Sequence, residues 1–211
     1  MLEINWFVYL AASLVIILSP GQDMVLVMSR GIGQGAKAGL ITAAGVSTGL
    51  MGHTLLAALG LGAVLAASEM AYAALKYAGA AYLFYLGVQL LMAGGGQLDA
   101  IRMRRSSLPR LFAEGALSNL SNPKIVLFYF AFLPQFVPAG AGNPTLLLIA
   151  LGAAFAILTF LVKVPMGMFA GALSDWFGAH PSVLGWMFRS SGLVLIGFGL
   201  RLVLEGDGRA K

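Results

Sequence analysis

The sequence predicts an all-α integral membrane protein with about six transmembrane helices. Of its 211 residues, 59% are hydrophobic and 10% are charged, and a mean hydropathy of +0.89 is outside the range of soluble domains. A spanning helix needs about 20 apolar residues, so a chain of this length accommodates about six spans with short loops. Its 28 glycines favour a packed bundle, because small residues let helix backbones approach each other in a bilayer. We therefore expect one transmembrane domain over residues 1–211.

Six apolar segments of the chain account for the predicted spans. Their expected limits are about 5–28, 39–67, 71–92, 111–136, 145–173 and 184–204. The first segment has the length of a signal-peptide core, but it lacks a basic n-region and a small-residue cleavage site, so we expect it to remain as a helix. The glycine-spaced stretch from Arg30 to Lys37 is expected to form the loop after span one. The glycines at 94–96 are expected to end span three.

Positive charge is concentrated in two of the predicted loops. The loops between spans one and two and between spans three and four hold six of the thirteen Lys and Arg, whereas the start of the chain and residues 139–144 hold none. Basic loops normally stay in the cytoplasm, so we expect both termini outside, although Arg209 and Lys211 oppose this orientation. No basic face or stacking platform accompanies the net charge of +5, so no nucleic-acid partner is expected.

Two polar interruptions of the apolar pattern divide the chain into similar halves. Residues Ser19 to Asp23 interrupt span one and residues Ser121 to Lys124 interrupt span four, and each interruption contains a proline. Three spans are an odd number, so a second half of about 106–205 would insert with the opposite orientation to a first half of about 1–96. Such inverted-topology repeats with broken helices are common in transporters.

Helix breaks at these interruptions would place polar backbone groups inside the membrane. A proline inside a helix removes a backbone hydrogen bond, so Pro20, followed by Gly21, and Pro123 are expected to break their helices. Freed groups are tolerated in hydrocarbon only where they line a cavity, and the helix N-termini beyond the breaks suit the carboxylate of a small zwitterion. The predicted substrate-binding residues are Ser19, Gly21, Gln22, Asp23, Asn122 and Lys124. The alternative is that the two prolines only kink packed helices.

Ionisable side chains inside spans are costly, and they mark candidate functional residues. Asp23 could bind an ammonium group or carry a coupled proton, or it could cap the second half of span one. Lys124 could hold a substrate carboxylate or form a structural ion pair with Asp23. His53, near the centre of span two, could carry protons, although a histidine in a small-residue interface is more often a packing element.

Lys163 lies in span five, two residues before Pro165, which is expected to break that span. The Lys163 ammonium could act with Asp23 as a proton-coupled switch, or the long side chain could snorkel to the interface. The remaining charges beside the spans, Glu69, Lys76, Glu114, Asp175, Arg189 and Arg201, are expected at the membrane interfaces.

Three stretches of the chain carry a family resemblance. They are Ser19-Pro20-Gly21, the glycine-spaced residues 29–49, and Asn122-Pro123-Lys124 continuing to Phe132-Leu133-Pro134-Gln135-Phe136. In these stretches the sequence resembles the LysE/RhtB family of lysine and homoserine/threonine exporters over nearly its whole length. The resemblance implies an inner-membrane exporter of amino acids or derivatives, driven by the proton-motive force. Gln22 departs from the family, which usually has a second proline there, so the break should be less rigid.

Metal binding, cofactor binding and the alternative functions each require particular residues. The chain has no cysteine and its two histidines lie far apart, so neither a metal site nor a cofactor is expected. The alternatives are a gated channel, which would need rings of charge built by oligomerisation, and, as the weaker one, an intramembrane enzyme, which would need a nucleophile with a base. We therefore expect a secondary transporter in the inner membrane, not an enzyme, with a small molecule and the lipid bilayer as partners. A homo-oligomer is left open.

Overall fold

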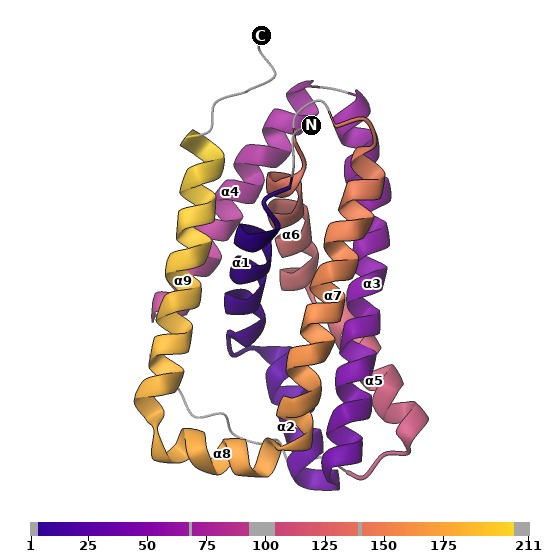
Figure 1. Ribbon diagram of the computed structural model, residues 1–211, viewed down its shortest axis with the longest axis vertical. Coiled ribbons are helices and arrows are strands. Elements are labelled where there is room, and N and C mark those ends of the chain that lie inside the picture. Colours follow the sequence, from indigo (N-terminus) through magenta and orange to yellow (C-terminus); the bar gives the residue numbers. More distant parts are fainter. Residues whose placement is uncertain (1–3, 68, 93–103, 139–140, 205–211) are drawn as a thin grey trace.

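The computed structural model describes residues 4–67, 69–92, 104–138 and 141–204. At residues 61–67, 69, 71, 72, 75, 123, 124 and 181 it describes the backbone without the side chain. Within these ranges the chain forms α-helices and one short 3-10 helix and no strand, so the predicted all-α fold is confirmed (Figure 1). The glycines at 94–96, Arg102, Arg209 and Lys211 lie outside the described residues.

The described residues form ten helical elements in chain order. They are α1 (Trp6–Leu18), α2 (Gln22–Gln34), α3 (Ala36–Ala67), α4 (Glu69–Met92), α5 (Leu108–Leu120), α6 (Pro123–Phe132), the 3-10 helix η1 (Leu133–Phe136), α7 (Pro144–Met168), α8 (Ala170–Ala179) and α9 (Pro181–Leu204). In the described part of the chain, three helical stretches are long and apolar enough to cross a membrane: Ala36–Gly60, Pro144–Met168 and Ser182–Leu204. The pair α1 and α2 gives a fourth if it forms one bent span. A total of six spans stays a prediction.

The chain leaves helical geometry at the two polar interruptions. Between α1 and α2 the helix axis bends by 58°, and the Ser19 amide closes α1 by donating to the carbonyl of Val15. Between α5 and α6 the interruption is Ser121 and Asn122. Pro123 is the first residue of α6, a position where the missing N–H of proline costs little because that group has no intrahelical partner. The pair α1 and α2 and the pair α5 and α6 are therefore each separated by a short non-helical segment with polar residues.

The glycine-spaced stretch after span one is helical, which corrects the predicted loop. Helix α2 continues to Gln34, and only Gly35 separates it from α3. Gly35 has a φ of +91°, which a residue with a side chain rarely adopts. The glycines on either side serve packing instead, since a Cβ at Gly31 would lie 2.1 Å from the Gly167 carbonyl oxygen and one at Gly39 would lie 2.3 Å from it.

Helix α7 differs from the prediction for span five. It ends at Met168 instead of near residue 173, and it continues through Pro165, so Pro165 does not break it. Proline removes one hydrogen bond to the carbonyl one turn earlier, but its own carbonyl accepts from the Phe169 amide at 2.9 Å. The helix therefore passes Pro165 before it ends. Helix α8 then crosses the lower end of the molecule toward α9 (Figure 1).

Glycines bring the long helices into backbone contact. A Cβ at Gly45 of α3 would lie 2.1 Å from the carbonyl oxygen of Phe112 on α5, and a Cβ at Gly152 of α7 would lie 2.3 Å from the hydroxyl of Thr54 on α3. A Cβ at Gly87 of α4 would lie 2.7 Å from the Gly192 carbonyl of α9. Three helix pairs are therefore joined through small residues, as in other membrane bundles.

The broken helices divide the bundle along its length. Figure 1 shows α1 and α6 in the upper half and α2 and α5 in the lower half, beside the long helices α3 and α7. The start of α7 and the end of α9 lie at the upper end, whereas the α2–α3 connection and the start of α5 lie at the lower end. The described basic residues of both predicted cytoplasmic loops belong to this lower end.

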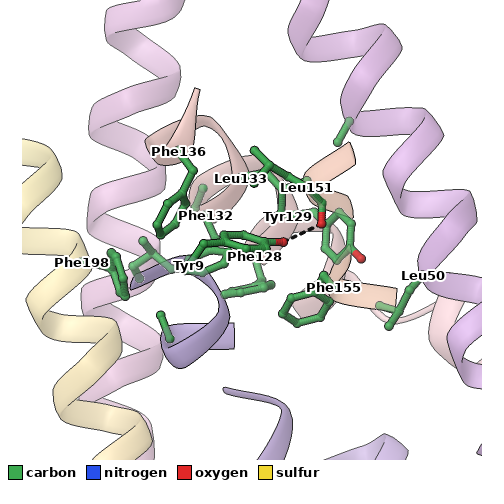
Figure 2. Packing of buried hydrophobic residues seen from close by; sticks show 14 of the residues in the cluster. Tyr9, Leu50, Phe128, Tyr129, Phe132, Leu133, Phe136, Leu151, Phe155 and Phe198 are labelled. Carbon is green, nitrogen blue, oxygen red and sulfur yellow. Dashed lines mark hydrogen bonds between the residues drawn. The ribbon is translucent and has the colours of Figure 1, made fainter. Parts of the chain in front are cut away.

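An aromatic cluster fills the upper half of the core (Figure 2). Its rings are Tyr9, Phe128, Tyr129, Phe132, Phe136, Phe155 and Phe198. The ring centroids of Phe128 and Phe132 are 4.8 Å apart, and those of Tyr9 and Phe136 are 4.9 Å apart. The Tyr9 hydroxyl is satisfied within this apolar region because it donates to the Leu151 carbonyl at 2.7 Å. The cluster joins α1, α6, η1, α7 and α9.

Candidate functional site

A cavity of about 400 Å³ lies where the two broken helices meet the long helices. Its apolar lining is Ile16, Ile17, Met24, Leu50, Leu86, Leu90, Ile125, Phe128, Phe155 and Leu195. Its polar lining is Ser19, Gln22, Asp23, Asn122, Thr159, Lys163 and Ser191, with Gly21. The volume is within the range of about 300–1,000 Å³ that is typical of small-molecule sites. A mostly apolar wall with a few polar groups is also typical of such sites.

Both helix breaks open onto this cavity. Gly21 is the residue before α2 and forms no side-chain cap, so the first N–H groups of α2 have no acceptor within the helix. Asn122 precedes α6, and its carbonyl accepts from the amides of Ile125 and Val126. Two helix N-termini, each with partial positive charge, therefore lie at one cavity. This end of the helix favours an anionic group of a ligand.

Asp23 lies in the first turn of α2 and lines the cavity. The side-chain amide of Asn119, on α5, donates to Asp23 Oδ2 at 2.8 Å. The other oxygen, Oδ1, is buried and has no hydrogen-bond partner in the described structure. A buried carboxylate oxygen without a donor is costly unless a ligand, a proton or water satisfies it.

Lys163 reaches the same cavity from α7. Its side chain is 5% exposed, and Thr159 and Phe155 lie one and two turns earlier on the same helix face. Asp23 lines the same cavity, but among the described residues no hydrogen bond or ion pair joins the two side chains. The cavity thus holds opposite charges on α2 and α7 without direct contact between them.

Four of the other predicted site residues line the cavity: Ser19, Gly21, Gln22 and Asn122. Their role in binding a substrate stays a prediction. The side chain of Lys124, near the start of α6, lies outside the described residues.

His53 is buried in α3 but does not line the cavity. Its Nε2 lies 3.0 Å from the Asn119 carbonyl oxygen. The His53 ring centroid is 5.9 Å from that of Tyr129, so the imidazole belongs to the packed region behind the cavity.

Sequence reasoning missed three polar residues of this region: Asn119, Thr159 and Ser191. Asn119 lies in the polar run Ser118-Asn119-Leu120-Ser121-Asn122, three residues before a predicted site residue, and that run was the available signal. Thr159 lies one helical turn before Lys163 and would face the same side. Ser191 could not have been found in this way, because its hydroxyl donates to the Val15 carbonyl, 176 residues away in sequence, at 3.0 Å.

A second polar group, the Arg30 cluster, lies away from the cavity between α2, the segment before α5, and α5 itself. It consists of Arg30, Gln34, Ser106, Arg110 and Glu114. Arg30 is 6% exposed and pairs with Glu114, and its Nη1 donates to the Gln34 side chain at 2.9 Å. Gln34 bonds both backbone groups of Ser106 at 3.0 Å. Glu114 is part of this cluster, and its expected place at a membrane interface stays a prediction.

A helical membrane bundle with a charged cavity where broken helices meet is the arrangement of a membrane transport protein. The family comparison agrees with this class. The chain belongs to the LysE type translocator family, whose model matches residues 14–206.

Relatives from several bacteria match most of the chain. A homoserine/homoserine lactone efflux protein of Salmonella typhi is 34% identical over 171 residues, or 81% of this chain and 82% of that protein. A leucine efflux protein of Klebsiella pneumoniae is 28% identical over 203 residues, or 94% of each chain. YrhP, an uncharacterised membrane protein of Bacillus subtilis, is 34% identical over 209 residues, or 94% of this chain and 97% of that protein. No solved structure matches the chain.

Proposed function

We propose that this protein exports amino acids or closely related small metabolites across the cell membrane in exchange for protons. The observation that carries the proposal is that Asp23 and Lys163 both line one otherwise mostly apolar cavity. A free amino acid carries an ammonium and a carboxylate. Asp23 can bind the ammonium, and Lys163 can bind the carboxylate. The relatives named for homoserine, homoserine lactone and leucine efflux support the same class of substrate.

The substrate ammonium is assigned to Asp23. Leucine, homoserine and homoserine lactone all carry an α-ammonium group, whereas the lactone has no free carboxylate, so the ammonium is the feature common to all three. The unpaired Oδ1 of Asp23 is a suitable acceptor for it. The carboxylate of a free amino acid would then bind Lys163 and the first amides of α2, and its side chain would contact the apolar wall.

Proton exchange follows from competition for the same carboxylate. Asp23 can accept a substrate ammonium or a proton, but the two cations cannot occupy one oxygen together. A protein that alternates between its two sides with one or the other bound would exchange substrate for proton. Lys163, which lines the same cavity, would face a charged Asp23 when neither cation is bound and a neutralised one when either is bound.

The membrane arrangement is also part of the proposal. Six spans as two inverted repeats would place one broken helix, α1/α2 or α5/α6, at the start of each half. The lower end in Figure 1, with its basic residues, would face the cytoplasm, and both termini would face outside. Because the chain has no cysteine, Arg105→Cys and Gly142→Cys can be labelled singly. If an impermeant reagent applied to intact cells labels residue 105 but not residue 142, the protein has the opposite orientation.

Counterflow in proteoliposomes tests the function. Vesicles loaded with unlabelled L-leucine or L-homoserine should take up the labelled compound through the wild-type protein and through Arg110→Gln, an exposed control. Asp23→Asn should insert and fold but should not exchange. Flux without exchange would indicate a channel, and a chemically altered molecule in mass spectra would indicate an enzyme. Normal exchange by purified Asp23→Asn would refute the role given to this carboxylate.

A further inference from the structure

Asn119 connects the two broken helices beside the cavity. It is the second-last residue of α5 and is 0% exposed. Its amide nitrogen donates to Asp23 Oδ2 at 2.8 Å, so the last turn of α5 is bonded to the first turn of α2. A second bond between the same turns runs from Gln22 Nε2 to Ser118 Oγ at 3.2 Å. Asn119 itself does not line the cavity, whereas Asp23, to which its side chain is bonded, does.

The backbone of Asn119 makes a separate contact with His53. The two atoms, His53 Nε2 and the Asn119 carbonyl oxygen, are 3.0 Å apart. A carbonyl oxygen only accepts hydrogen bonds, so Nε2 carries the hydrogen. The other ring nitrogen, Nδ1, is buried and has no partner in the described part of the chain. Asn119 thus contacts Asp23 through its side chain and His53 through its main chain.

A glycine on α3 provides the space for Asn119. Gly49 lies one turn before His53, and a Cβ there would lie 2.9 Å from the Asn119 Cβ and 3.0 Å from its Oδ1. The Asn119 side chain is therefore confined between α3 and α2. Its Oδ1 is buried and has no partner in the structure as described, so the side chain's hydrogen bonding is directed to Asp23.

The geometry points to Asn119 as a positioning residue that holds Oδ2 of Asp23, leaves Oδ1 for the cargo, and ties this carboxylate to His53. The inference rests on the proposed role of Asp23 in binding the substrate ammonium. A carboxylate with one oxygen fixed has fewer orientations to lose when it binds, so fixing it strengthens binding. His53 contacts the α5 segment that carries Asn119 and does not itself line the cavity.

The test compares two neighbouring variants of α5. Asn119→Ala removes the donor to Asp23 but keeps the main-chain contact with His53. Ser118→Ala, the matched control, removes the other bond between the same helix turns and leaves Asp23 paired. Both are measured in proteoliposomes by counterflow of L-leucine and L-homoserine. The second readout needs no transport: the rate at which a hydrophobic carbodiimide modifies Asp23, followed by mass spectrometry of the Asp23 peptide.

We expect Asn119→Ala to raise the half-saturation concentration about tenfold or more while the maximal rate changes less, because a hydrogen bond to a charged group is lost. Carbodiimide modification of Asp23 should become several-fold faster, because the amide no longer shields Oδ2. Ser118→Ala should change both quantities by less than about twofold. Equal values in Asn119→Ala and wild type, or equal effects of the two variants, would overturn the inference.

A charge exchange keeps the inference testable if Asn119→Ala does not fold. The double variant Asp23→Asn/Asn119→Asp keeps the hydrogen-bonded pair but moves the carboxylate to the residue that does not line the cavity. It should fold and lose exchange, whereas normal half-saturation in this variant would overturn the inference. If the wild type exchanges neither probe, the proposed function fails, and the carbodiimide rates still decide whether Asn119 holds Asp23.

Discussion

The cavity and the Arg30 cluster are both polar regions within an apolar bundle, but they differ in how their polar atoms are paired. In the cluster, both oxygens of Glu114 and both side-chain polar atoms of Gln34 have partners, and Arg30 Nε is the buried atom left without one. At the cavity, Asp23 Oδ1, Ser19 Oγ and Thr159 Oγ1 are buried and unpartnered in the described structure.

The difference indicates different tasks for the two regions. Buried polar groups are normally hydrogen-bonded, and a network in which most polar atoms have partners holds together the elements that it joins. The Arg30 cluster therefore fastens the lower parts of α2 and α5 to each other. Unpaired polar atoms at a cavity have capacity left for a ligand. The same helix, α2, thus carries Asp23 at the cavity and, seven residues later, Arg30 in the cluster.

The largest effect is expected at Lys163. Lys163→Met removes the cationic side of the cavity, and we expect counterflow to fall about 100-fold or more, because one partner of a desolvated charge pair is lost. The protein should stay folded, since the side chain lines a cavity and forms no hydrogen bond or ion pair within the described structure. Lys163→Arg should restore only part of the rate because its guanidinium is larger and stays charged. Intact exchange by Lys163→Met would remove Lys163 from the site.

Arg30→Met should lower stability and leave binding unchanged. It removes the cation that pairs with Glu114 and that also donates to Gln34 Oε1 and to the Arg104 carbonyl. We expect the free energy of unfolding to fall by about 2 kcal/mol, because Glu114 is partly open to water. The midpoint of unfolding in detergent measures this loss. The half-saturation concentration should change less than about twofold. A tenfold change in it would show that the cluster also shapes the cavity.

Two threonines provide a matched pair for the comparison. Thr159→Val removes an unpartnered hydroxyl at the cavity, so stability should hold or rise slightly, while the half-saturation concentration should increase about threefold to tenfold. Thr42→Val removes a buried hydroxyl that donates to the Ala38 carbonyl at 2.9 Å, so it should cost about 1 kcal/mol with unchanged affinity. Thermal unfolding and counterflow separate the two outcomes. A loss of affinity in Thr42→Val would contradict this division.

The smallest effect is expected at Ser191, which lines the cavity but is already bonded to the Val15 carbonyl. Ser191→Ala should lower stability by about 1 kcal/mol and change the half-saturation concentration less than about twofold. Ser191→Ala tests whether a cavity hydroxyl contributes to binding only when it lacks a hydrogen-bond partner in the protein, or whenever it lines the cavity. An affinity loss as large as that of Thr159→Val would show that location decides.

Much of the fold and part of the candidate site could be predicted from the sequence. Composition placed the chain in a membrane, and Pro20 and Pro123 located the two helix interruptions, because the lost N–H of proline acts on the nearest turn of its own helix. The Arg30 to Lys37 stretch was predicted as a loop because glycine weakens isolated helices. In the structure, Gly31 of this stretch instead allows close contact with α7. That contact depends on a helix distant in sequence, so the local sequence could not predict it.

The sequence by itself determined the all-helical membrane class, the family, and the presence of Asp23 and Lys163 inside apolar segments. Tertiary structure alone decided that Asn119 bonds Asp23 and that Arg30 pairs with Glu114, contacts between residues 96 and 84 positions apart. It also decided that His53 lies behind the cavity instead of lining it. The physical reason is range: hydropathy and proline act within a few turns of one helix, whereas a partner for a buried polar atom is chosen by how distant helices pack.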